Sequence, residues 1–536
     1  MLLRGELDHN GRAVALEILY PDLFPYLRPE VYAPSLALER HQNPALHNLC
    51  LLESTTQSWR PTDTGAWLVA ERVPRLLSLS EAGPEEMAEA EVPQGEPISA
   101  YFPGLAGTVI FVPEAALAVD SEFRVGSGRL CFAPESPPQL GVRALLSELV
   151  VRTRKRKTKV AARADEPLLR RFGGAHIQIR WVRLDTARGG FDAEAIFAAA
   201  DEAQDGFGRP PWQSVGDGDV AVTGAVFPEE VRQGVIEDAW LFAVRGRRTS
   251  AGQVHEVTYV IRGERLATED FGVRIPKLAP LQGAVVSQVG IGALGAPLAL
   301  ELARNQVGEL RLLEHDHVEA AQTVRWPFGL EAVGHHKLEV ISAFVERNYP
   351  YTRIERFAHR LGQTALERHS RDENELDLIA RFLAPASMVV DASAEVGVQL
   401  LISDFAHERG LVQLYVSATE GARGGQVALI VPGRGGCWYC WKSYALEDAI
   451  PRPPFDGEAT VQPRGCASPT FTGASFDLLP VAAQAVRTVA AAVSLNDHRS
   501  RVWVCSLPAD EISPPEWSGH RVDAHPDCPR CGSARA

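Results

Sequence analysis

The chain has 536 residues, more than one hydrophobic core normally serves, so two or three domains are expected. Apolar residues make up 45% and charged residues 23%, a globular composition that excludes global disorder. The formal net charge of -14 argues against a general nucleic-acid or membrane-surface binder, because phosphate-rich surfaces repel an acidic protein.

Two further features bear on where the chain works. Charged residues interrupt the N-terminal segment where a signal sequence would carry its apolar stretch, and no run of about 18 apolar residues is evident. We therefore expect a cytoplasmic protein that binds neither membrane nor nucleic acid. The basic run at residues 152–159 is most simply a solvated strand edge or linker, although an acidic partner or a nucleic acid stays open for it.

Residues 1–80 predict a small α+β domain. Short apolar runs, such as residues 13–20, alternate with proline-bearing turns, and a helical stretch follows at residues 66–77. Cys50 lies in the apolar segment NLCLL, where a buried strand cysteine is the plainest interpretation from local sequence.

Residues 81–98 are rich in Glu, Pro, Gly and Ala and predict a linker. Residues 99–270 predict a mixed α+β middle region without a chemical motif. Strand-like segments lie at 108–112, 176–184, 240–246 and 257–263, and helix-like stretches lie at 193–203 and 227–239. Cys131 lies in a segment that is typical of a core strand.

Residues 271–536 predict a doubly wound, Rossmann-like α/β domain, because a strand, a glycine loop, a helix and a second strand follow one another from residue 284. Gly290, Gly292 and Gly295 form the G-x-G-x-x-G pattern, in which backbone N–H groups and a helix N-terminus hold phosphate oxygens. Glu314 ends the second strand, where a carboxylate can bond ribose hydroxyls. These features alone would equally describe an NAD-dependent dehydrogenase.

Two cations and a carboxylate favour ATP over a dinucleotide. Arg325 and Lys337 follow Glu314, and a triphosphate needs such neutralisation more than a dinucleotide does. Asp391 follows the apolar segment SMVV at the end of a predicted parallel strand, where a carboxylate can hold Mg²⁺. A helix-capping role is the alternative for Asp391. The chain also offers no evident hydride-transfer site.

Four cysteines predict a zinc site. Cys437 and Cys440 form C-W-Y-C, and Cys528 and Cys531 form C-P-R-C. Four thiolates leave no open coordination position, so the zinc ion would be structural and would tie the C-terminal tail to its domain. A redox role for either pair is the alternative. Cys505 lies in a segment that is typical of a core strand.

Cys466 lies between these pairs, in a segment rich in Gly, Pro, Ser and Thr that predicts an exposed loop. A thiolate there, favoured by the charge of Arg464, could attack an acyl-adenylate and form a thioester. An incidental loop cysteine is the alternative.

The segments GIGALG, EHD, VRW, VGHHK and VVDAS resemble the ThiF-type adenylating domain of ubiquitin-activating enzymes and of sulfur-carrier activators. The resemblance implies that Glu314 holds ribose, that Asp316 belongs to an acidic pair, that Arg325 and Lys337 bind triphosphate and that Asp391 binds Mg²⁺. It also implies the four-cysteine zinc site and a homodimer. The sequence departs from the family in having Glu314 for the usual Asp, and Thr-Val-Arg-Trp for Asn-Leu-x-Arg-Gln.

The N-terminal segment is similar to ubiquitin-conjugating enzymes. LEILYPDLFPYLRPEV, His41-Gln42-Asn43, NLCLLE around Cys50 and WRP occur in the same order as that family's landmarks. The resemblance implies that Cys50 is a transfer cysteine and that Asn43 stabilises the oxyanion, with His47 or Asn48 as alternatives. Gln42 stands where the family has proline.

The domain order resembles the fusion protein of bacterial CBASS antiviral operons and of related ubiquitin-like operons. That resemblance implies adenylation of a protein C-terminal carboxylate, capture by Cys466, transfer to Cys50 and conjugation to a target amine. The carboxylate would belong to a cyclic-nucleotide synthase (CD-NTase) or to a ubiquitin-like protein. The alternatives are a sulfur-carrier adenylyltransferase without a relay and a non-catalytic scaffold that is switched by ATP.

Overall fold

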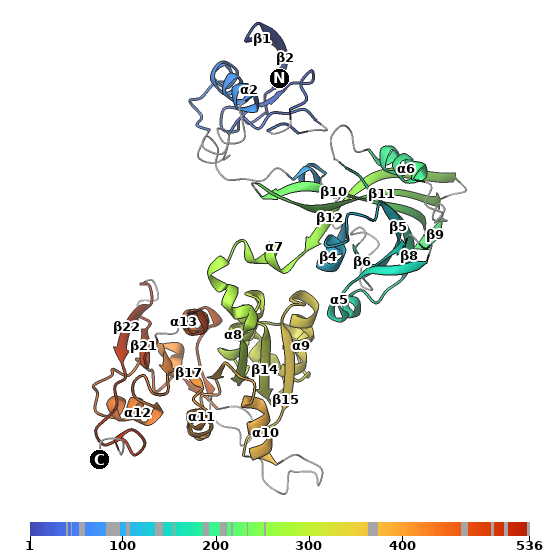
Figure 1. Ribbon diagram of the computed structural model, residues 1–536. Helices are drawn as coiled ribbons and strands as arrows, with labels where there is room; N and C mark the ends of the chain where they lie inside the picture. Colours follow the sequence, from blue (N-terminus) through green and yellow to red (C-terminus); the bar gives the residue numbers. More distant parts are fainter. Residues whose placement is uncertain are drawn as a thin grey trace. The chain divides into compact units, whose positions relative to one another are not determined.

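A computed structural model describes two compact units, residues 1–270 and 271–536. The residues that it describes are 1–38, 41–43, 46–52, 59–81, 97–102, 108–133, 143–153, 155, 157–185, 192–203, 212–215, 218–232, 234–250, 253–362, 374–462, 470–494, 498–508 and 513–532. Figure 1 shows the elements of each unit along the chain.

The first unit opens with an antiparallel three-stranded sheet of β1 (Leu2–His9), β2 (Arg12–Leu19) and β3 (Glu30–Tyr32). A helix follows as three consecutive parts: α1 (Gly65–Trp67), the π-helical η1 (Leu68–Arg72) and α2 (Val73–Glu81). Val14 and Leu16 alternate on β2 and pack with Leu68 and Val73 in one core. The segment thus contains both strands and a helix, as its sequence pattern predicted.

The rest of the first unit is a closed β-barrel. Its strands pair in the ring β10-β11-β12-β4-β6-β5-β8, which returns to β10, while β7 pairs with β6 and β9 pairs with β10. The strands are β4 (Val109–Pro113), β5 (Val125–Phe132), β6 (Arg143–Arg152), β7 (Thr158–Arg163), β8 (His176–Arg183), β9 (Gln213–Val215), β10 (Gly218–Arg232), β11 (Val235–Ser250) and β12 (Gln253–Leu266). The helices are η2 (Ile98–Tyr101), α4 (Glu114–Leu117), α5 (Glu166–Arg171) and α6 (Ala193–Glu202).

Side chains fill the barrel. Trp181, Trp240 and Phe242 are buried in its core, and Trp240 stacks on Phe242 with ring centroids 5.7 Å apart. Gly126 is required where the barrel wall meets Trp181, since a Cβ there would lie 2.6 Å from the indole nitrogen. The barrel is therefore a packed core.

One predicted helix of this region is wrong. Residues 227–239 form the end of β10, a turn and the start of β11, with Glu229 opposite Glu237. The apolar residues Phe227, Val231 and Ile236 suggested a helix, but Val235 and Ile236 pair across the ladder with Arg232 and Glu230, and Gly234 adopts φ 72° in the turn. Pairing across the barrel outweighs the helical spacing.

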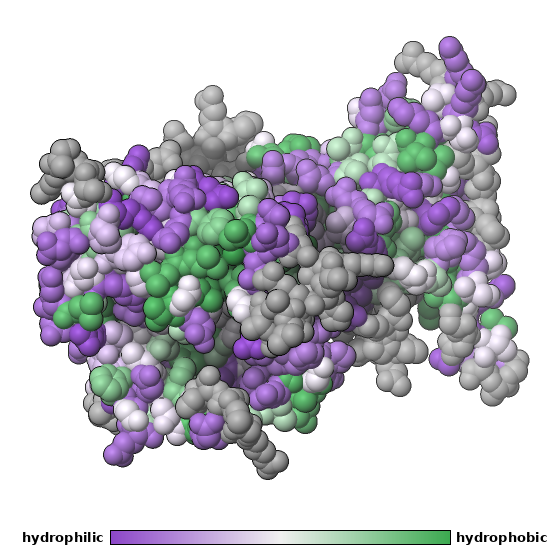
Figure 2. Space-filling view, turned by 90° about the horizontal axis from the view of Figure 1, so that it is seen from below, coloured by the Kyte–Doolittle hydropathy of each residue, from purple (hydrophilic) through white to green (hydrophobic). Residues whose placement is uncertain are grey.

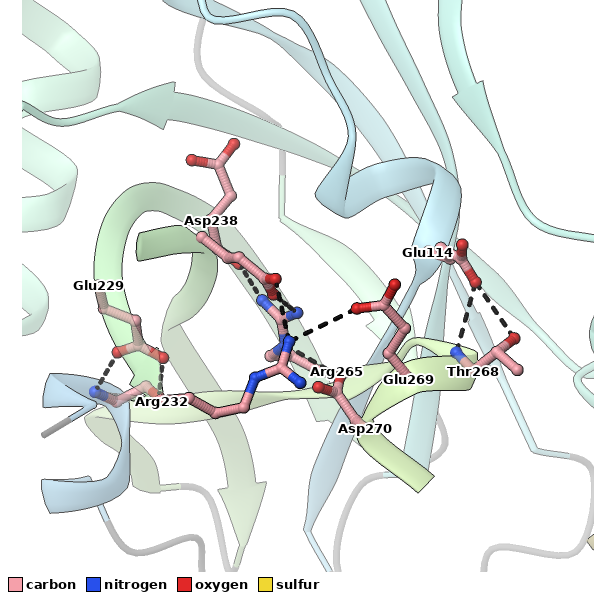
Figure 3. Close-up of polar contacts among 10 residues, drawn as sticks. Glu114, Glu229, Arg232, Asp238, Arg265, Thr268, Glu269 and Asp270 are labelled. Atoms are coloured by element: carbon pink, nitrogen blue, oxygen red, sulfur yellow. Dashed lines mark hydrogen bonds and ion pairs between the residues drawn. The ribbon is translucent and has the colours of Figure 1, made fainter. Parts of the chain in front are cut away.

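A polar network fixes the two ends of the barrel segment to the β10–β11 hairpin (Figure 3). Glu229 accepts hydrogen bonds from the backbone N and the Oγ of Ser99, both at 2.8 Å, so η2 is tied to β10. Arg265, near the end of β12, pairs with Glu237 and donates to Asp270 at 3.0 Å. The helix α7 (Thr268–Gly272) is thereby tied to the same hairpin.

The second unit is an eight-stranded sheet in the order β15-β14-β13-β16-β17-β18-β21-β22. β13, β14, β15, β16 and β17 are parallel, and β18, β21 and β22 are antiparallel to their neighbours. The strands are β13 (Val285–Val289), β14 (Glu309–Glu314), β15 (Arg353–Ala358), β16 (Met388–Asp391), β17 (Val412–Ala418), β18 (Gly424–Ile430), β19 (Thr460–Val461), β20 (Thr470–Phe471), β21 (Arg501–Ser506) and β22 (Glu516–Arg521).

The helices of this unit are η3 (Pro276–Gly283), α8 (Gly295–Arg304), η4 (Ala320–Val324), η5 (Leu330–Ala332), α9 (Lys337–Asn348), α10 (Glu375–Leu383), α11 (Val396–Glu408), η6 (Glu420–Ala422), α12 (Trp438–Leu446) and α13 (Ser475–Ser494). α8, α9 and α13 cover one face of the sheet, and α10, α11 and α12 cover the other. This is the doubly wound, Rossmann-like arrangement that the sequence predicted, so the multidomain α/β prediction is confirmed.

α13 is long and apolar enough to cross a membrane, although no such segment was predicted from the sequence. Its buried residues Leu478, Val481, Ala485 and Val489 pack into the core of the sheet. The core helix of a globular domain satisfies the same criterion, and this packing accounts for the apolar character of α13.

Large apolar side chains are also exposed on the second unit. Leu446, Phe455 and Phe476 are 74%, 67% and 70% exposed, and they come before and after residues 463–469 in the chain. Figure 2 shows one face of the molecule, on which hydrophobic residues gather in a continuous area among hydrophilic ones. Apolar area of this kind is a usual feature of protein-binding surfaces.

Candidate nucleotide site and cysteine centres

The glycine loop connects β13 to α8 and needs glycine at two of its three positions. Gly290 has φ 83°, and a Cβ there would lie 2.9 Å from the backbone of Ala392. A Cβ on Gly295 would lie 2.1 Å from the carbonyl oxygen of Gly290. Gly292 has nothing within 4 Å of its Cβ position, so open space lies above the loop. The loop and the N-terminus of α8 can therefore approach a phosphate group closely.

Glu314 holds this loop in place from the end of β14. Its Oε2 accepts a hydrogen bond from the N–H of Ile291 at 2.9 Å, and its Oε1 accepts from the N–H groups of His315 and Asp316 at 2.8 and 3.0 Å. Trp326 donates its indole N–H to the carbonyl of Ile291 at 2.9 Å. A carboxylate has about four lone-pair sites, so Glu314 retains capacity for one further donor, such as a ribose hydroxyl.

Asp316 and Lys337 form a close ion pair beside the glycine loop. Lys337 Nζ lies 2.8 Å from Asp316 Oδ2, and the N–H of Lys337 donates to the carbonyl of Asp316 at 2.9 Å. Burial would raise the pKa of Asp316, but the hydrogen bond and charge of Lys337, with His315 and His317, lower it overall. Lys337 is buried at the start of α9, and Asp316 fixes its ammonium group in a position where it can bind an anion.

Asp391 is buried at the end of β16, against the same loop. Its Oδ1 accepts from the N–H and the Oγ of Ser393 at 2.9 and 2.8 Å. Its Oδ2 is buried and has no hydrogen-bond partner among the described residues. Burial raises the pKa of Asp391 to about 6, although Ser393 and the charge of Lys442 lower it. An unpartnered carboxylate oxygen at this position fits a divalent cation.

The sequence predicted that Arg325 binds triphosphate, but in the structure its guanidinium contacts residues of β20. Its Nη1 donates to the carbonyl of Phe471 at 2.7 Å, its Nη2 lies 3.3 Å from Thr470 Oγ1, and its guanidinium lies 5.1 Å from the centre of the Phe471 ring. Burial lowers the pKa of this arginine. Arg325 thus contacts β20, which directly follows residues 463–469.

Cys466 and Arg464 lie outside the described residues. The strands β19 and β20 on either side of them pair as a short antiparallel ladder, with Thr460 opposite Phe471.

The four predicted metal ligands come together. The sulfur atoms of Cys437, Cys440, Cys528 and Cys531 all lie within 4.8 Å of one another. Cys437 Sγ is 3.8 Å from Cys440 Sγ and 3.6 Å from Cys528 Sγ. Four thiolates around one tetrahedral zinc ion lie about 3.8 Å apart, so the residues fit a closed structural site.

Cys50 is exposed and directly follows Leu49, which forms an antiparallel bridge with Gln42. Its N–H donates to the carbonyl of His41 at 2.7 Å, Gln42 pairs with Leu49, and the N–H of Asn43 donates to the carbonyl of Asn48 at 2.9 Å. The side-chain oxygen of Asn43 accepts from the N–H of Leu46 at 3.0 Å, so this amide caps the turn. Gln42 is buried and bonds Leu38 and Ala33, which explains its place in the segment.

Sequence reasoning missed three supporting residues. Gln288 donates to the carbonyls of Gly290 and Gly295 at 3.0 and 2.7 Å and closes the loop. Trp326 contacts Ile291. The signal for this contact in the sequence was that Trp326 departs from the family pattern. Lys442 lies 3.8 Å from the centre of the Trp441 ring, and burial lowers its pKa to about 8 although the charge of Asp391 raises it. Its position two residues after Cys440 was the only signal for it in the sequence.

Comparisons with known proteins give a family. The model of the ThiF family matches residues 272–507. The protein y4oA of Sinorhizobium fredii (strain NBRC 101917 / NGR234) is 31% identical over 562 residues, which cover 99% of this chain and 91% of y4oA. The adenylyltransferase and sulfurtransferase UBA4 of Debaryomyces hansenii is 23% identical over 231 residues, and this alignment covers 42% of this chain and 45% of UBA4. Ubiquitin-like modifier-activating enzyme 5 of Gallus gallus is 28% identical over 168 residues, and this alignment covers 29% of this chain and 39% of that enzyme.

Proposed function

The chain belongs to the ThiF family, and from this premise we propose that it is an ATP-dependent enzyme that adenylates the C-terminal carboxylate of a protein. The names of the related enzymes support this chemistry, since one is an adenylyltransferase and another activates a ubiquitin-like modifier. The observation that carries the proposal is the ion pair of the buried Lys337 with Asp316 beside the open glycine loop.

In the proposed reaction a carboxylate oxygen attacks the α-phosphorus of ATP. The bond from that phosphorus to the bridging oxygen breaks, and pyrophosphate leaves with its electron pair. The loop around Gly292 and Lys337 hold phosphate oxygens, and Glu314 keeps the loop in position through Ile291. Positioning and charge neutralisation are the main contributions of a protein to such a transfer.

Two metals complete the proposal. Asp391, through its unpartnered Oδ2, would hold Mg²⁺, which supplies charge neutralisation on the phosphates. Cys437, Cys440, Cys528 and Cys531 would hold a structural Zn²⁺ that takes no part in the chemistry.

A thioester relay follows adenylation in this proposal. The thiolate of Cys466 attacks the acyl carbon, and AMP leaves from it. The thiolate of Cys50 then attacks the thioester and releases Cys466, and an amine of a target protein finally displaces Cys50 to give an amide. The exposure of Cys50 supports this role, because an incoming thioester must reach the sulfur.

The partner is a protein with a flexible C-terminal carboxylate, either a CD-NTase or a ubiquitin-like protein. We place the reaction in the cytoplasm of a bacterium, in antiviral defence, and expect a homodimer. These parts of the proposal rest on the resemblance of the domain order.

Binding of nucleotide is the first test. Isothermal titration calorimetry of the full chain should show binding of a non-hydrolysable ATP analogue with Mg²⁺ and no binding of NAD. The Lys337→Ala variant should weaken this binding about 10- to 100-fold, while Lys277→Ala, which changes an exposed lysine, should retain it. Binding of NAD in preference to the ATP analogue would overturn the proposal.

The relay has its own test, because adenylation can occur without it. The chain is incubated with ATP, Mg²⁺ and the proteins encoded by neighbouring genes, and thiol-sensitive adducts are measured by intact mass and non-reducing electrophoresis. Adducts should vanish in Cys466→Ala, lose one carrier site in Cys50→Ala and persist in Cys131→Ala. Adenylate without either thioester would refute the relay and favour the sulfur-carrier activity that the name of UBA4 includes.

A further inference from the structure

Among the described residues, β22 is one of the two edge strands of the eight-stranded sheet, the other being β15. It pairs with β21 on one side, from Arg501 opposite Arg521 to Ser506 opposite Glu516. Glu516–Gly519 and Arg521 are exposed, and His520 is partly buried. An exposed edge strand presents unpaired backbone N–H and C=O groups, to which an extended peptide can add as a further strand.

The face of the sheet beside this edge carries cations in register. Leu429 lies opposite Arg501, and Arg501 lies opposite Arg521, so the three side chains stand in one row across β18, β21 and β22. Trp503 follows on the same face and lies opposite Gly519. A Cβ on Gly519 would lie 3.5 Å from the Trp503 ring, so glycine there leaves the indole accessible at the edge.

These residues line a groove of about 620 Å³. Its walls are Leu429, His498, Arg499, Arg501, Trp503 and Arg521. The guanidinium of Arg501 lies 5.9 Å from the centre of the Trp503 ring, and Arg521 forms an exposed 3.8 Å ion pair with Asp523. Among the described residues, no carboxylate pairs with Arg499 or Arg501. Three guanidinium groups and one indole in an acidic chain select an anionic ligand with an apolar part.

The groove is separate from the nucleotide site. Asp391 shares its row of the sheet with Tyr415, Ala428 and Val502, whose side chains belong to the face that packs on α12. Arg501 precedes Val502 and therefore points to the opposite face. Three strand spacings separate the β16 row from β21, which is about 14 Å. A ligand in the groove would not occupy the ATP position.

We propose that this groove and the edge of β22 bind an extended, acidic segment of a partner protein. The segment adds to β22 as a further strand, with a carboxylate in the row of Arg501 and Arg521 and, two residues away on the same face, an apolar side chain in the row of Gly519 and Trp503. A peptide fits better than a nucleic acid because the cations occupy one short row beside an exposed edge strand, and a peptide backbone can pair with that edge whereas a sugar–phosphate backbone cannot.

The test is fluorescence anisotropy of the full chain with the labelled octapeptide TETLTETL, in which glutamate and leucine alternate on one face of a strand. We expect saturable binding that weakens with salt, and no binding of the matched peptide with lysine in place of glutamate. The Arg501→Glu/Arg521→Glu double variant should lower affinity about tenfold or more. The Arg487→Glu variant, which changes an exposed arginine on α13, should bind as the wild type does.

Two further probes separate strand addition from charge alone. A version of the peptide that is N-methylated at alternate amides cannot pair with an edge strand and should bind much more weakly. Equal affinity for both versions, equal loss in the double variant and in Arg487→Glu, or tighter binding of a single-stranded oligonucleotide would each overturn the proposal. Unchanged binding of the ATP analogue shows that the double variant is folded.

Discussion

The nucleotide edge of the second unit and the Cys50 turn of the first unit differ in how much polar structure holds their reactive groups. At the nucleotide edge, Glu314 accepts three backbone hydrogen bonds, and Asp316 and Lys337 are paired across 2.8 Å. Cys50 is exposed and follows a bridged residue beside a capped turn. The first site is preorganised for a charged ligand, whereas we expect the second to gain its chemistry from the thioester that reaches it.

The largest expected effect comes from removing one ligand of the proposed zinc site, which lies in the second unit. Cys437→Ser should lower the stability of that unit by about 5 kcal/mol or more, because metal binding to four thiolates contributes folding free energy directly. Zinc content by mass spectrometry should fall, and hydrogen exchange should lose protection in α12 and retain it in β2. Cys131→Ser is the control, and full zinc content in Cys437→Ser would contradict the assignment.

Breaking the ion pair tests preorganisation itself. Lys337→Ala leaves Asp316 half-buried without its cation and should weaken binding of the ATP analogue about 10- to 100-fold, since a charge-assisted hydrogen bond contributes about 1.5–3 kcal/mol. Calorimetry measures the loss. Lys337→Arg keeps the charge and should recover part of the affinity; identical affinity in all three proteins would show that the pair has no part in binding.

Protonation of Asp391 should make both the free energy of unfolding and the binding of Mg²⁺ with the ATP analogue depend on pH. Its pKa is raised by burial from 3.8 to about 6, so between these values the folded chain binds more protons than the unfolded chain. The free energy of unfolding of the ligand-free chain should therefore fall as pH rises from about 4 to about 6, while affinity for Mg²⁺ with the ATP analogue should rise. Asp391→Asn should lose both slopes in denaturant titrations and calorimetry. A slope that persists in the variant would assign it to another group.

The smallest effect is expected at Asn43. If Asn43 were catalytic, the Cys50 turn would also hold a preorganised group, and the two sites would no longer differ in this respect. Asn43→Ala removes the acceptor of the Leu46 N–H and should lower stability by about 1 kcal/mol. Asn43→Asp keeps the acceptor but removes the amide donor. If Asn43→Asp transfers acyl groups at the wild-type rate, the residue is a turn cap; a rate loss at unchanged stability would assign it to the oxyanion.

The parts of the fold that the sequence predicted best are those with a local cause. The order of strand, glycine loop and helix at residues 285–304 follows from a buried strand and from two positions where only glycine fits, and the cysteine spacing placed four sulfurs together. Residues 227–239 were predicted wrongly because the pairing of β10 with β11 depends on the closed barrel. The contacts of Trp326 and Arg325 depend on segments far along the chain, so local spacing could not reveal them.

The most direct test of adenylation is exchange of radiolabelled pyrophosphate into ATP by the full chain, with each protein encoded by neighbouring genes as the carboxyl substrate. The account predicts exchange that needs Mg²⁺ and the intact C-terminus of one such protein, that is lost in Lys337→Ala and that persists in Cys466→Ala and Cys50→Ala. Binding of the ATP analogue without exchange for any of these proteins would contradict carboxylate activation and leave a nucleotide-binding scaffold.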